Sequence, residues 1–321
     1  MYLEPQWNFL CSIQSVLSEM VLQIGIVTEN VFGSLCGREF GFTCWGELRE
    51  LYGLGEGGVM TCPVCSGRMS ACFAARVLDK YDAAYEVCED CGFLRVRDPH
   101  WLEEAYSSAI ASSDTGLVMR NISLACKLAG VLYWVLGERG QGTYLDAAGG
   151  YGLLTRIMRD FGFDFYWSDK YCQNLLAPGF EFQEESGPCR AVTALEVFEH
   201  LADPKMYVQD VLRYSGSEYL FFTTELYGIR PPKPNEWPYY SLKTGQHIGF
   251  FQVKTVEALA SGLGLKFFSA NGVHVLSKKE INRGLMHMVT RRWVSAFMPI
   301  LTRRYLGSKT MTDNQLILSR H

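Results

Sequence analysis

The sequence predicts an α/β fold, a doubly wound and mostly parallel sheet accompanied by a small cysteine-rich module. A strand-like run, a glycine-rich loop and a helical pattern follow one another in residues 143–162. Further buried strand patterns alternate with helical patterns after this unit, which is typical of parallel sheets. Two Cys-x-x-Cys pairs precede it and indicate a metal-bound module beside the sheet.

Composition excludes several classes of protein. The length of 321 residues predicts a main domain with smaller modules, and 48% hydrophobic residues suffice for a core. A net charge of −4 and a pI near 5.9 argue against a nucleic-acid-binding protein, which is usually basic. The 11 cysteines are odd in number and no secretory signal is recognisable, so a reducing cytoplasm is expected. The sequence contains no uninterrupted apolar run of about 18 residues, so it predicts no membrane span.

Residues 1–59 are expected to be an N-terminal extension. Their apolar part, residues 10–31, has polar breaks, and a glycine-rich linker follows it. No basic segment precedes the apolar part, which argues against a targeting peptide. Two interpretations stay open, an accessory or poorly ordered extension and a helix packed on the main domain.

Four cysteines carry the most specific local signal. Cys62 and Cys65 form one Cys-x-x-Cys pair, and Cys88 and Cys91 form another 22 residues later. This spacing is typical of a four-thiolate zinc site, in which each pair wraps as a knuckle. Four ligands complete the tetrahedron, so the expected Zn²⁺ is structural. A redox pair, an iron–sulfur site and four buried thiols are the alternatives.

The glycine-rich loop predicts a cofactor site. Asp146 ends the first strand-like run, Gly150 and Gly152 allow a ligand to approach the backbone, and Asp169 ends the next run. A dinucleotide loop would need a glycine where Thr155 stands. Asp146 would repel a pyrophosphate but suits an ammonium and a sulfonium, which favours S-adenosylmethionine. A plain tight turn is the alternative.

A second group of polar residues follows the strand expected at residues 191–195. Glu196, Glu199 and His200 come directly after it, at the edge where doubly wound sheets bind ligands. The two glutamates have an alternative role, which is to cap the following helix or to orient His200. Asp203 and a proline then begin that helix.

The end of the sheet carries a long loop and a hairpin. The loop after the strand at 218–223 is rich in proline and aromatic residues and ends near His247, which makes it a candidate substrate lid. Asn271-Gly272 separates two strand patterns and predicts a type I′ hairpin. The parallel sheet is therefore expected to finish with antiparallel strands.

At this point residues 144–277 resemble the class I S-adenosylmethionine-dependent methyltransferases. The run LDAAGGYG resembles their first motif, with Ala148 in place of the first glycine, and Asp169 matches the acid that binds the ribose. LEVFEHLADP and GQHIGFF resemble later motifs of the small-molecule branch. The cysteine module is similar to that of sugar methyltransferases, including C-methyltransferases.

The resemblance implies a seven-stranded, Rossmann-like sheet with helices on both faces and a small-molecule acceptor, such as a sugar or glycan precursor. It implies that His247 is the catalytic base, although Gln246 stands where a glutamate is usual, and His200 is the second candidate. A structural histidine bonded to the backbone is the alternative for each. The expected cofactor-binding residues are Asp146, Ala148, Gly150, Gly152, Asp169 and Glu196.

Four regions are therefore expected: the extension at 1–59, the zinc knuckle at 60–100, the methyltransferase domain at 101–277, and a basic amphipathic tail at 278–321. The tail carries five arginines and no acid between residues 281 and 306. It would lie on an anionic membrane surface or pack on the domain with a solvated basic face.

Two functions are compatible with these patterns. The first is a methyltransferase that acts on a small molecule. The second is a catalytically inactive methyltransferase-like binding protein whose zinc module docks a partner. The residues of the cofactor loop are needed by both and do not separate them.

Overall fold

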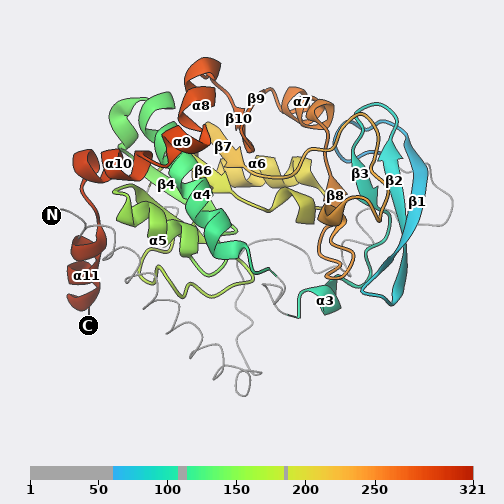
Figure 1. Cartoon of the computed structure of the whole chain (residues 1–321), viewed down its shortest axis with the longest axis horizontal. Coiled ribbons are helices and arrows are strands. Elements are labelled where there is room, and N and C mark those ends of the chain that lie inside the picture. Colours follow the sequence, from blue (N-terminus) through green and yellow to red (C-terminus); the bar gives the residue numbers. More distant parts are fainter. Residues whose placement is uncertain (1–60, 108–113, 184–186, 321) are drawn as a thin grey trace. The chain divides into compact units, whose positions relative to one another are not determined.

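The computed structural model describes residues 61–107, 114–183 and 187–320 (Figure 1). The chain divides into two compact units, Met1–Gly58 and Val59–His321, and the described residues all belong to the second. The extension expected at residues 1–59 lies outside the described residues.

The second unit is built on a six-stranded sheet in the order β5-β4-β6-β7-β10-β9. The first four strands of this order are parallel, and β10 runs antiparallel to both β7 and β9. This confirms the doubly wound, mostly parallel sheet that ends in a hairpin. The strands are β4 (Thr143–Ala147), β5 (Asp164–Ser168), β6 (Ala191–Ala194), β7 (Tyr219–Phe222), β9 (Lys266–Ala270) and β10 (Val273–Ser277).

The seventh strand implied by the resemblance is reduced to one bridge. Trp167 of β5 pairs in parallel with Glu181 alone, through hydrogen bonds of 2.8 Å to the backbone of Phe180 and Phe182. Pro178 and Gly179, immediately before this segment, both disfavour a strand. The sheet of the described residues therefore has six strands, which corrects the expected count of seven.

Helices cover both faces of this sheet because its strands alternate their side chains. Tyr144 of β4 packs in a core with α4 and α5, whereas its neighbour Leu145 packs in a second core with α6 and α7. Before β4 the chain forms the long helix α4, which is continued by the π-helical turn η1. The helices and the turn are α4 (Leu117–Gly130), η1 (Val131–Val135), α5 (Leu153–Asp160), α6 (Pro204–Ser215) and α7 (Val253–Gly262).

Two local predictions are confirmed in detail. Asn271 and Gly272 have φ values of 50° and 79°, as a type I′ turn between β9 and β10 requires. Asp203 caps α6 by accepting a hydrogen bond of 2.9 Å from the backbone N–H of Met206, and Pro204 is the first helical residue.

A second sheet joins the cysteine-rich segment to the segment that carries the six-stranded sheet. Its order is β1-β2-β3-β8, and the first three strands come from residues 69–96. The fourth, β8, comes from the loop after β7, and Leu94 of β3 pairs with Phe250 of β8. The module expected at 60–100 therefore shares a sheet with the later segment. The strands are β1 (Met69–Val77), β2 (Tyr81–Cys88), β3 (Leu94–Val96) and β8 (Gly249–Phe250).

The segment expected as a basic tail forms four short helices. Met286, Val289 and Met298 bury their side chains in the core that contains α4. Asp313 of α11 accepts hydrogen bonds of 2.8 Å from the buried Arg159 of α5, so the end of the chain is fastened to the domain. The helices are α8 (Arg283–Val289), α9 (Arg292–Ser295), α10 (Met298–Leu306) and α11 (Thr310–Leu318).

Within residues 61–107, 114–183 and 187–320, no helix combines the length and the apolar character needed to cross a membrane.

Candidate functional site

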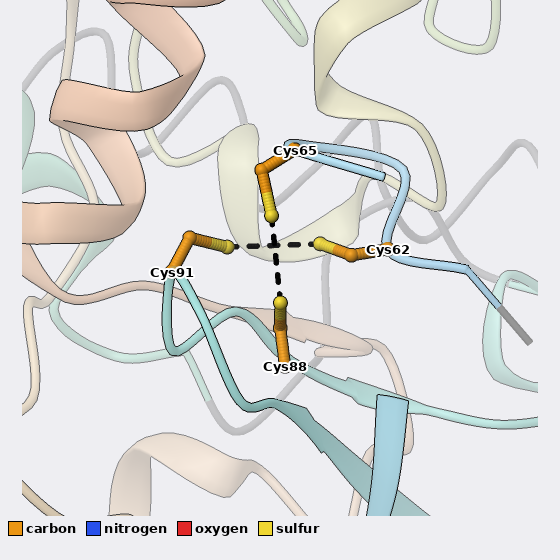
Figure 2. Close-up of side chains that lie close together, drawn as sticks. All are labelled: Cys62, Cys65, Cys88 and Cys91. Atoms are coloured by element: carbon orange, nitrogen blue, oxygen red, sulfur yellow. Dashed lines mark hydrogen bonds between the residues drawn. The ribbon is translucent and has the colours of Figure 1, made fainter. Parts of the chain in front are cut away.

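The four-cysteine cluster consists of Cys62, Cys65, Cys88 and Cys91. Figure 2 shows their sulfur atoms pointing toward a common centre from two turns of the chain. The Sγ atoms of Cys62 and Cys91 lie 3.6 Å apart, those of Cys65 and Cys88 lie 3.5 Å apart, and all four lie within 4.8 Å of one another. A tetrahedron with Zn–S bonds of about 2.3 Å has edges of about 3.8 Å, so the cluster fits zinc.

Both turns are built as knuckles. Ser66 donates a backbone hydrogen bond of 2.8 Å to Cys62, and Gly92 donates one of 3.0 Å to Cys88. Gly92 has a φ of 72°, which a glycine adopts without strain. The hydrogen bond with Cys91 lowers the pKa of the Cys62 thiol, so the cluster readily supplies a thiolate.

Asp146 lies beneath the glycine-rich loop at the end of β4 and is only 2% exposed. Thr155 and Thr193 donate side-chain hydrogen bonds of 3.2 and 3.0 Å to its carboxylate. Burial raises the pKa of Asp146 to about 7 despite these bonds. A positively charged group bound nearby would lower this pKa again, which suits the charge argument made from the sequence.

The loop itself has an open backbone. Ala148, Gly150 and Gly152 have φ values of 56°, 55° and 85°, and a Cβ built on Gly150 would meet nothing within 4 Å. Asp169 of the segment after β5 accepts a hydrogen bond of 2.9 Å from the backbone N–H of Gly150. The structure therefore brings together the predicted loop residues and the predicted acid.

Tyr207 of α6 belongs to the same place and was missed from the sequence. Its hydroxyl is buried without a hydrogen-bond partner among the described residues. Burial raises its pKa, and the charges of Asp146 and Asp169 raise it further. An orphaned hydroxyl beside an open glycine loop fits a bound polar ligand. No spacing rule marks this tyrosine, because it lies on a helix at an ordinary amphipathic position.

Glu196 comes directly after β6 and is held by side chains of α4 and β7. Arg120 of α4 forms an ion pair of 3.2 Å with one of its oxygens, and Thr223 donates a hydrogen bond of 2.6 Å to the other. Its φ of 55° is unusual for a residue with a side chain. This geometry aligns Glu196 at the ligand edge of the sheet, with its charge already paired.

The carboxylate–histidine cluster consists of Glu199, His200 and His247. Their ligand atoms lie within 4.8 Å of one another, although Glu199 and His247 are far apart in sequence. Glu199 is 0% exposed, and neither carboxylate oxygen has a hydrogen-bond partner among the described residues. Burial, followed by the charge of Glu196, raises the pKa of Glu199 to about 8, and the nearby hydroxyls of Tyr239 and Thr224 only moderate this rise.

Backbone carbonyls orient the two imidazoles. The Nδ1 atom of His200 lies 3.0 Å from the carbonyl oxygen of Gln246, and that of His247 lies 2.6 Å from the carbonyl oxygen of Tyr239. A carbonyl only accepts, so Nδ1 of His247 carries the proton and its Nε2 keeps an electron pair. Nδ1 of His200 also lies 2.8 Å from the hydroxyl oxygen of Tyr106, which itself lies 3.5 Å from the same carbonyl, so either the imidazole or the hydroxyl donates to it. Burial lowers the pKa of both histidines, to about 3 for His247, where His200 adds to the effect.

The second sheet determines where His247 lies. β8 begins two residues after it, and Val96 donates a backbone hydrogen bond of 2.9 Å to Ile248 beside it. Gln246, which the sequence marked as a departure from the usual glutamate, donates a hydrogen bond of 2.9 Å from its side chain to Ala105. The residue is therefore a structural contact to α3 (Leu102–Ala105).

Residues 126–270 match the family model of a methyltransferase domain. No curated protein matches the chain. An O-methyltransferase family 2 protein from Planctomyces limnophilus DSM 3776, solved with apigenin, is similar at 16% sequence identity. The match covers 56% of this chain and 65% of that protein, with a TM-score of 0.36.

Two further solved structures give similar figures. A possible histamine N-methyltransferase from Thermotoga maritima is 12% identical in sequence. The match covers 56% of this chain and 98% of that protein, with a TM-score of 0.36. The magnesium protoporphyrin IX methyltransferase from Synechocystis PCC 6803, with bound SAH, is 12% identical in sequence. The match covers 55% of this chain and 90% of that protein, with a TM-score of 0.35. TM-scores this low carry no conclusion about activity. Residues 126–270 match a methyltransferase domain, and the sheet order is that of the class I methyltransferase fold.

Proposed function

We propose that the protein transfers a methyl group from S-adenosylmethionine to a small-molecule acceptor. The observation that carries this proposal is a single sheet edge with an open glycine loop, where Asp169 contacts Gly150, and a half-buried pair of neutral histidines. S-adenosylmethionine supplies a methyl carbon whose bond to sulfur breaks, leaving its electrons on sulfur, as the acceptor's lone pair forms the new bond.

The glycine loop is the proposed cofactor site. Gly150 leaves the backbone open, Gly152 allows the close approach of Asn174, Ala148 completes the turn, and Asp169 has carboxylate lone pairs left for ribose hydroxyls. Asp146, beneath the loop, would balance the positive charge of the ligand. Glu196 would border the site from β6.

His247 is the proposed group for proton removal. Its Nε2 electron pair is free because Nδ1 is bound to the carbonyl of Tyr239. Its lowered pKa keeps the ring neutral at physiological pH, so it can take a proton as the acceptor reacts. His200, whose ring centroid lies 4.9 Å away, is the second candidate.

The remaining assignments are proposals of the same kind. The four-cysteine cluster would hold a structural Zn²⁺, because four thiolates leave no open position. A saccharide acceptor has the sequence resemblance as its support. Peripheral membrane contact is supported by the exposed side chains of Trp293 and Phe297, which are 79% and 62% accessible. They lie beside the exposed Arg291 and Arg292.

Calorimetry with the purified protein tests the cofactor assignment. S-adenosylmethionine or its demethylated product should bind at micromolar affinity, ~8 kcal/mol. Gly150→Val should remove binding, since its side chain would enter the space over the loop, which the structure leaves open. Gly264→Val is the matched control, because Gly264 has a similar left-handed φ of 65° and similar space but lies just after α7. Tight binding of NAD with none of S-adenosylmethionine would contradict the proposal.

A labelling experiment separates the enzyme from an inactive binding protein. The small molecules that co-purify with the protein would be incubated with it and with methyl-labelled S-adenosylmethionine, and analysed by mass spectrometry. The proposal expects label in a small molecule with the wild type and none with Gly150→Val. Cofactor binding without label in any acceptor pool would favour the binding protein, with the cysteine module docking its partner.

A further inference from the structure

We propose that the carboxylate–histidine cluster binds one divalent first-row transition-metal cation, to which a hydroxyl oxygen of the acceptor also coordinates. Glu199 would supply a carboxylate oxygen, and His200 and His247 would each supply Nε2. This inference rests on the proposed function, because it names how the same site engages the acceptor.

The first argument is the carboxylate of Glu199. It is fully buried, both oxygens lack a hydrogen bond among the described residues, and the neighbouring acid Glu196 disfavours its charged form. Buried carboxylates are otherwise paired or bound to metal, because an isolated buried charge is costly. Arg120, the cation of this region, is engaged with Glu196 and Asp114. Glu199 therefore lacks a positive partner.

The second argument is the orientation of the imidazoles. Nδ1–H of His247 donates to the backbone carbonyl of Tyr239, and Nδ1 of His200 is engaged by the carbonyl of Gln246 and the hydroxyl of Tyr106. Histidines that bind metals nearly always donate their other N–H to a carbonyl or carboxylate, which fixes the ligand nitrogen. Nε2 of His247 is thus prepared as a ligand, and so is Nε2 of His200 when its own Nδ1 donates to the carbonyl. An imidazole with so low a pKa as that of His247 is a weak base, but it keeps the electron pair that coordination needs.

The third argument is the composition of the cluster. Two imidazoles and one carboxylate suit first-row cations, and three protein ligands leave positions open for substrate. Glu196 does not join them, because Arg120 and Thr223 already bind its oxygens. The ligands also come from two segments, so the site exists only when the loop before β8 is in place.

The bound cation gives the acceptor site a specific chemistry. A coordinated hydroxyl loses its proton to water more easily, because the cation lowers its pKa. The oxygen's electron pair then forms the bond to the methyl carbon, and the methyl's former bonding pair stays on the sulfur. The site would therefore favour hydroxylated acceptors and methylation on oxygen. In the metal-bound form His247 would act as a ligand, and this role would replace the proton removal proposed for it without a cation.

The test uses Mn²⁺ as the probe, because soft four-thiolate sites select zinc, whereas manganese suits oxygen ligands such as the carboxylate of Glu199. Full-length protein would be dialysed against EDTA until metal analysis gives one zinc per chain. Loss of the free Mn²⁺ signal in electron paramagnetic resonance would then measure binding. We expect one Mn²⁺ per wild-type chain and a more than ~100-fold weaker affinity in Glu199→Gln and in His247→Ala.

The control is His287→Ala, since His287 is an exposed histidine of α8 outside the cluster, and it should bind Mn²⁺ like the wild type. Calorimetry with the demethylated cofactor product checks that each variant is folded and reports on the proposed function independently. Two results would overturn the inference while that calorimetry leaves the proposed function standing. One is a wild type that binds no Mn²⁺, and the other is equal binding by wild type, Glu199→Gln and His247→Ala.

Discussion

The four-cysteine cluster and the carboxylate–histidine cluster differ in how far apart in the sequence their residues lie. The cysteines all come from two turns at the ends of one small sheet, within 30 residues of sequence (62–91). The other cluster joins Glu199 and His200, which follow β6, with His247, which precedes β8. A short-range set can form with its own module, whereas a long-range set needs the whole domain to be folded.

The two clusters also differ in how many of their polar atoms have a partner inside the cluster. The cysteine sulfurs pair with one another at 3.5 and 3.6 Å, and four of them complete a tetrahedral shell. Glu199 has no such partner, and each histidine keeps one nitrogen free. This difference indicates a closed site that stabilises structure and an open site that can engage a ligand.

The largest effect should follow from opening the closed site. Cys88→Ser removes one thiolate, so we expect loss of the proposed zinc and local unfolding of residues 61–97, because small zinc sites depend on about 10–16 kcal/mol of metal binding. Metal analysis and hydrogen exchange measure both. Cys72→Ser is the control, since Cys72 is exposed and outside the cluster. A Cys88→Ser protein with full zinc content and unchanged exchange would contradict this.

Removing a ligand from the open site should leave the fold intact and affect chemistry. His247→Ala is expected to reduce turnover by ~10²-fold or more, with cofactor affinity nearly unchanged. Because the pKa of His247 is lowered to about 3, no limb of the pH–rate profile near 6.5 should belong to it. Turnover with an identified acceptor is the measurement, and normal turnover would make this histidine structural.

A smaller effect concerns the unpaired charge of Glu199. Its pKa rises from 4.5 to about 8 on folding, so its contribution to stability is complete below 4.5 and is lost as the pH rises to about 8. Without a cation, Glu199→Gln should therefore be more stable than the wild type above that pH, by about 1–3 kcal/mol, and not below pH 4.5.

Thermal unfolding at both pH values checks this prediction. With a saturating divalent cation the order should reverse, since the carboxylate then has its partner and the amide is a poorer ligand. A Glu199→Gln protein that is less stable than the wild type at high pH without metal would mean that Glu199 already has a partner.

The smallest effect concerns the backbone of the glycine loop. Ala148 adopts a left-handed φ of 56°, which glycine occupies without strain. Ala148→Gly should raise stability by less than about 1 kcal/mol, because the extra freedom of glycine in the unfolded chain offsets part of the gain. Chemical denaturation measures it, and a loss of stability would show that the methyl group of Ala148 packs usefully.

The local parts of this molecule could be predicted from the sequence. The gathering of the four cysteines, the cap at Asp203 and the Asn271-Gly272 turn each depend on residues close together in the chain, and the structure contains all three, while the zinc stays a prediction. The seventh strand was not, because the pattern of apolar residues around Glu181 does not reveal that only one bridge forms.

Contacts between distant segments could not be predicted in the same way. The sequence named His247 and His200 as rivals for one role, whereas the structure places their rings side by side with Glu199. Tyr207 was missed for the same reason. The pairing of β3 with β8 joins segments more than 150 residues apart, and no periodicity records such a partner.

The pairing of β3 with β8 has a consequence for how this protein could diversify. The chain between Tyr227 and Ile248 is clamped at both ends: Tyr227 donates a hydrogen bond of 2.9 Å to Phe251, and Ile248 accepts one of 2.9 Å from Val96. A segment with fixed ends tolerates insertions, since the entropic cost of closing a loop grows slowly with its length. This segment could therefore be replaced by another sequence. The replacement would change which acceptor molecules bind, while the glycine loop on the neighbouring strands stays unchanged.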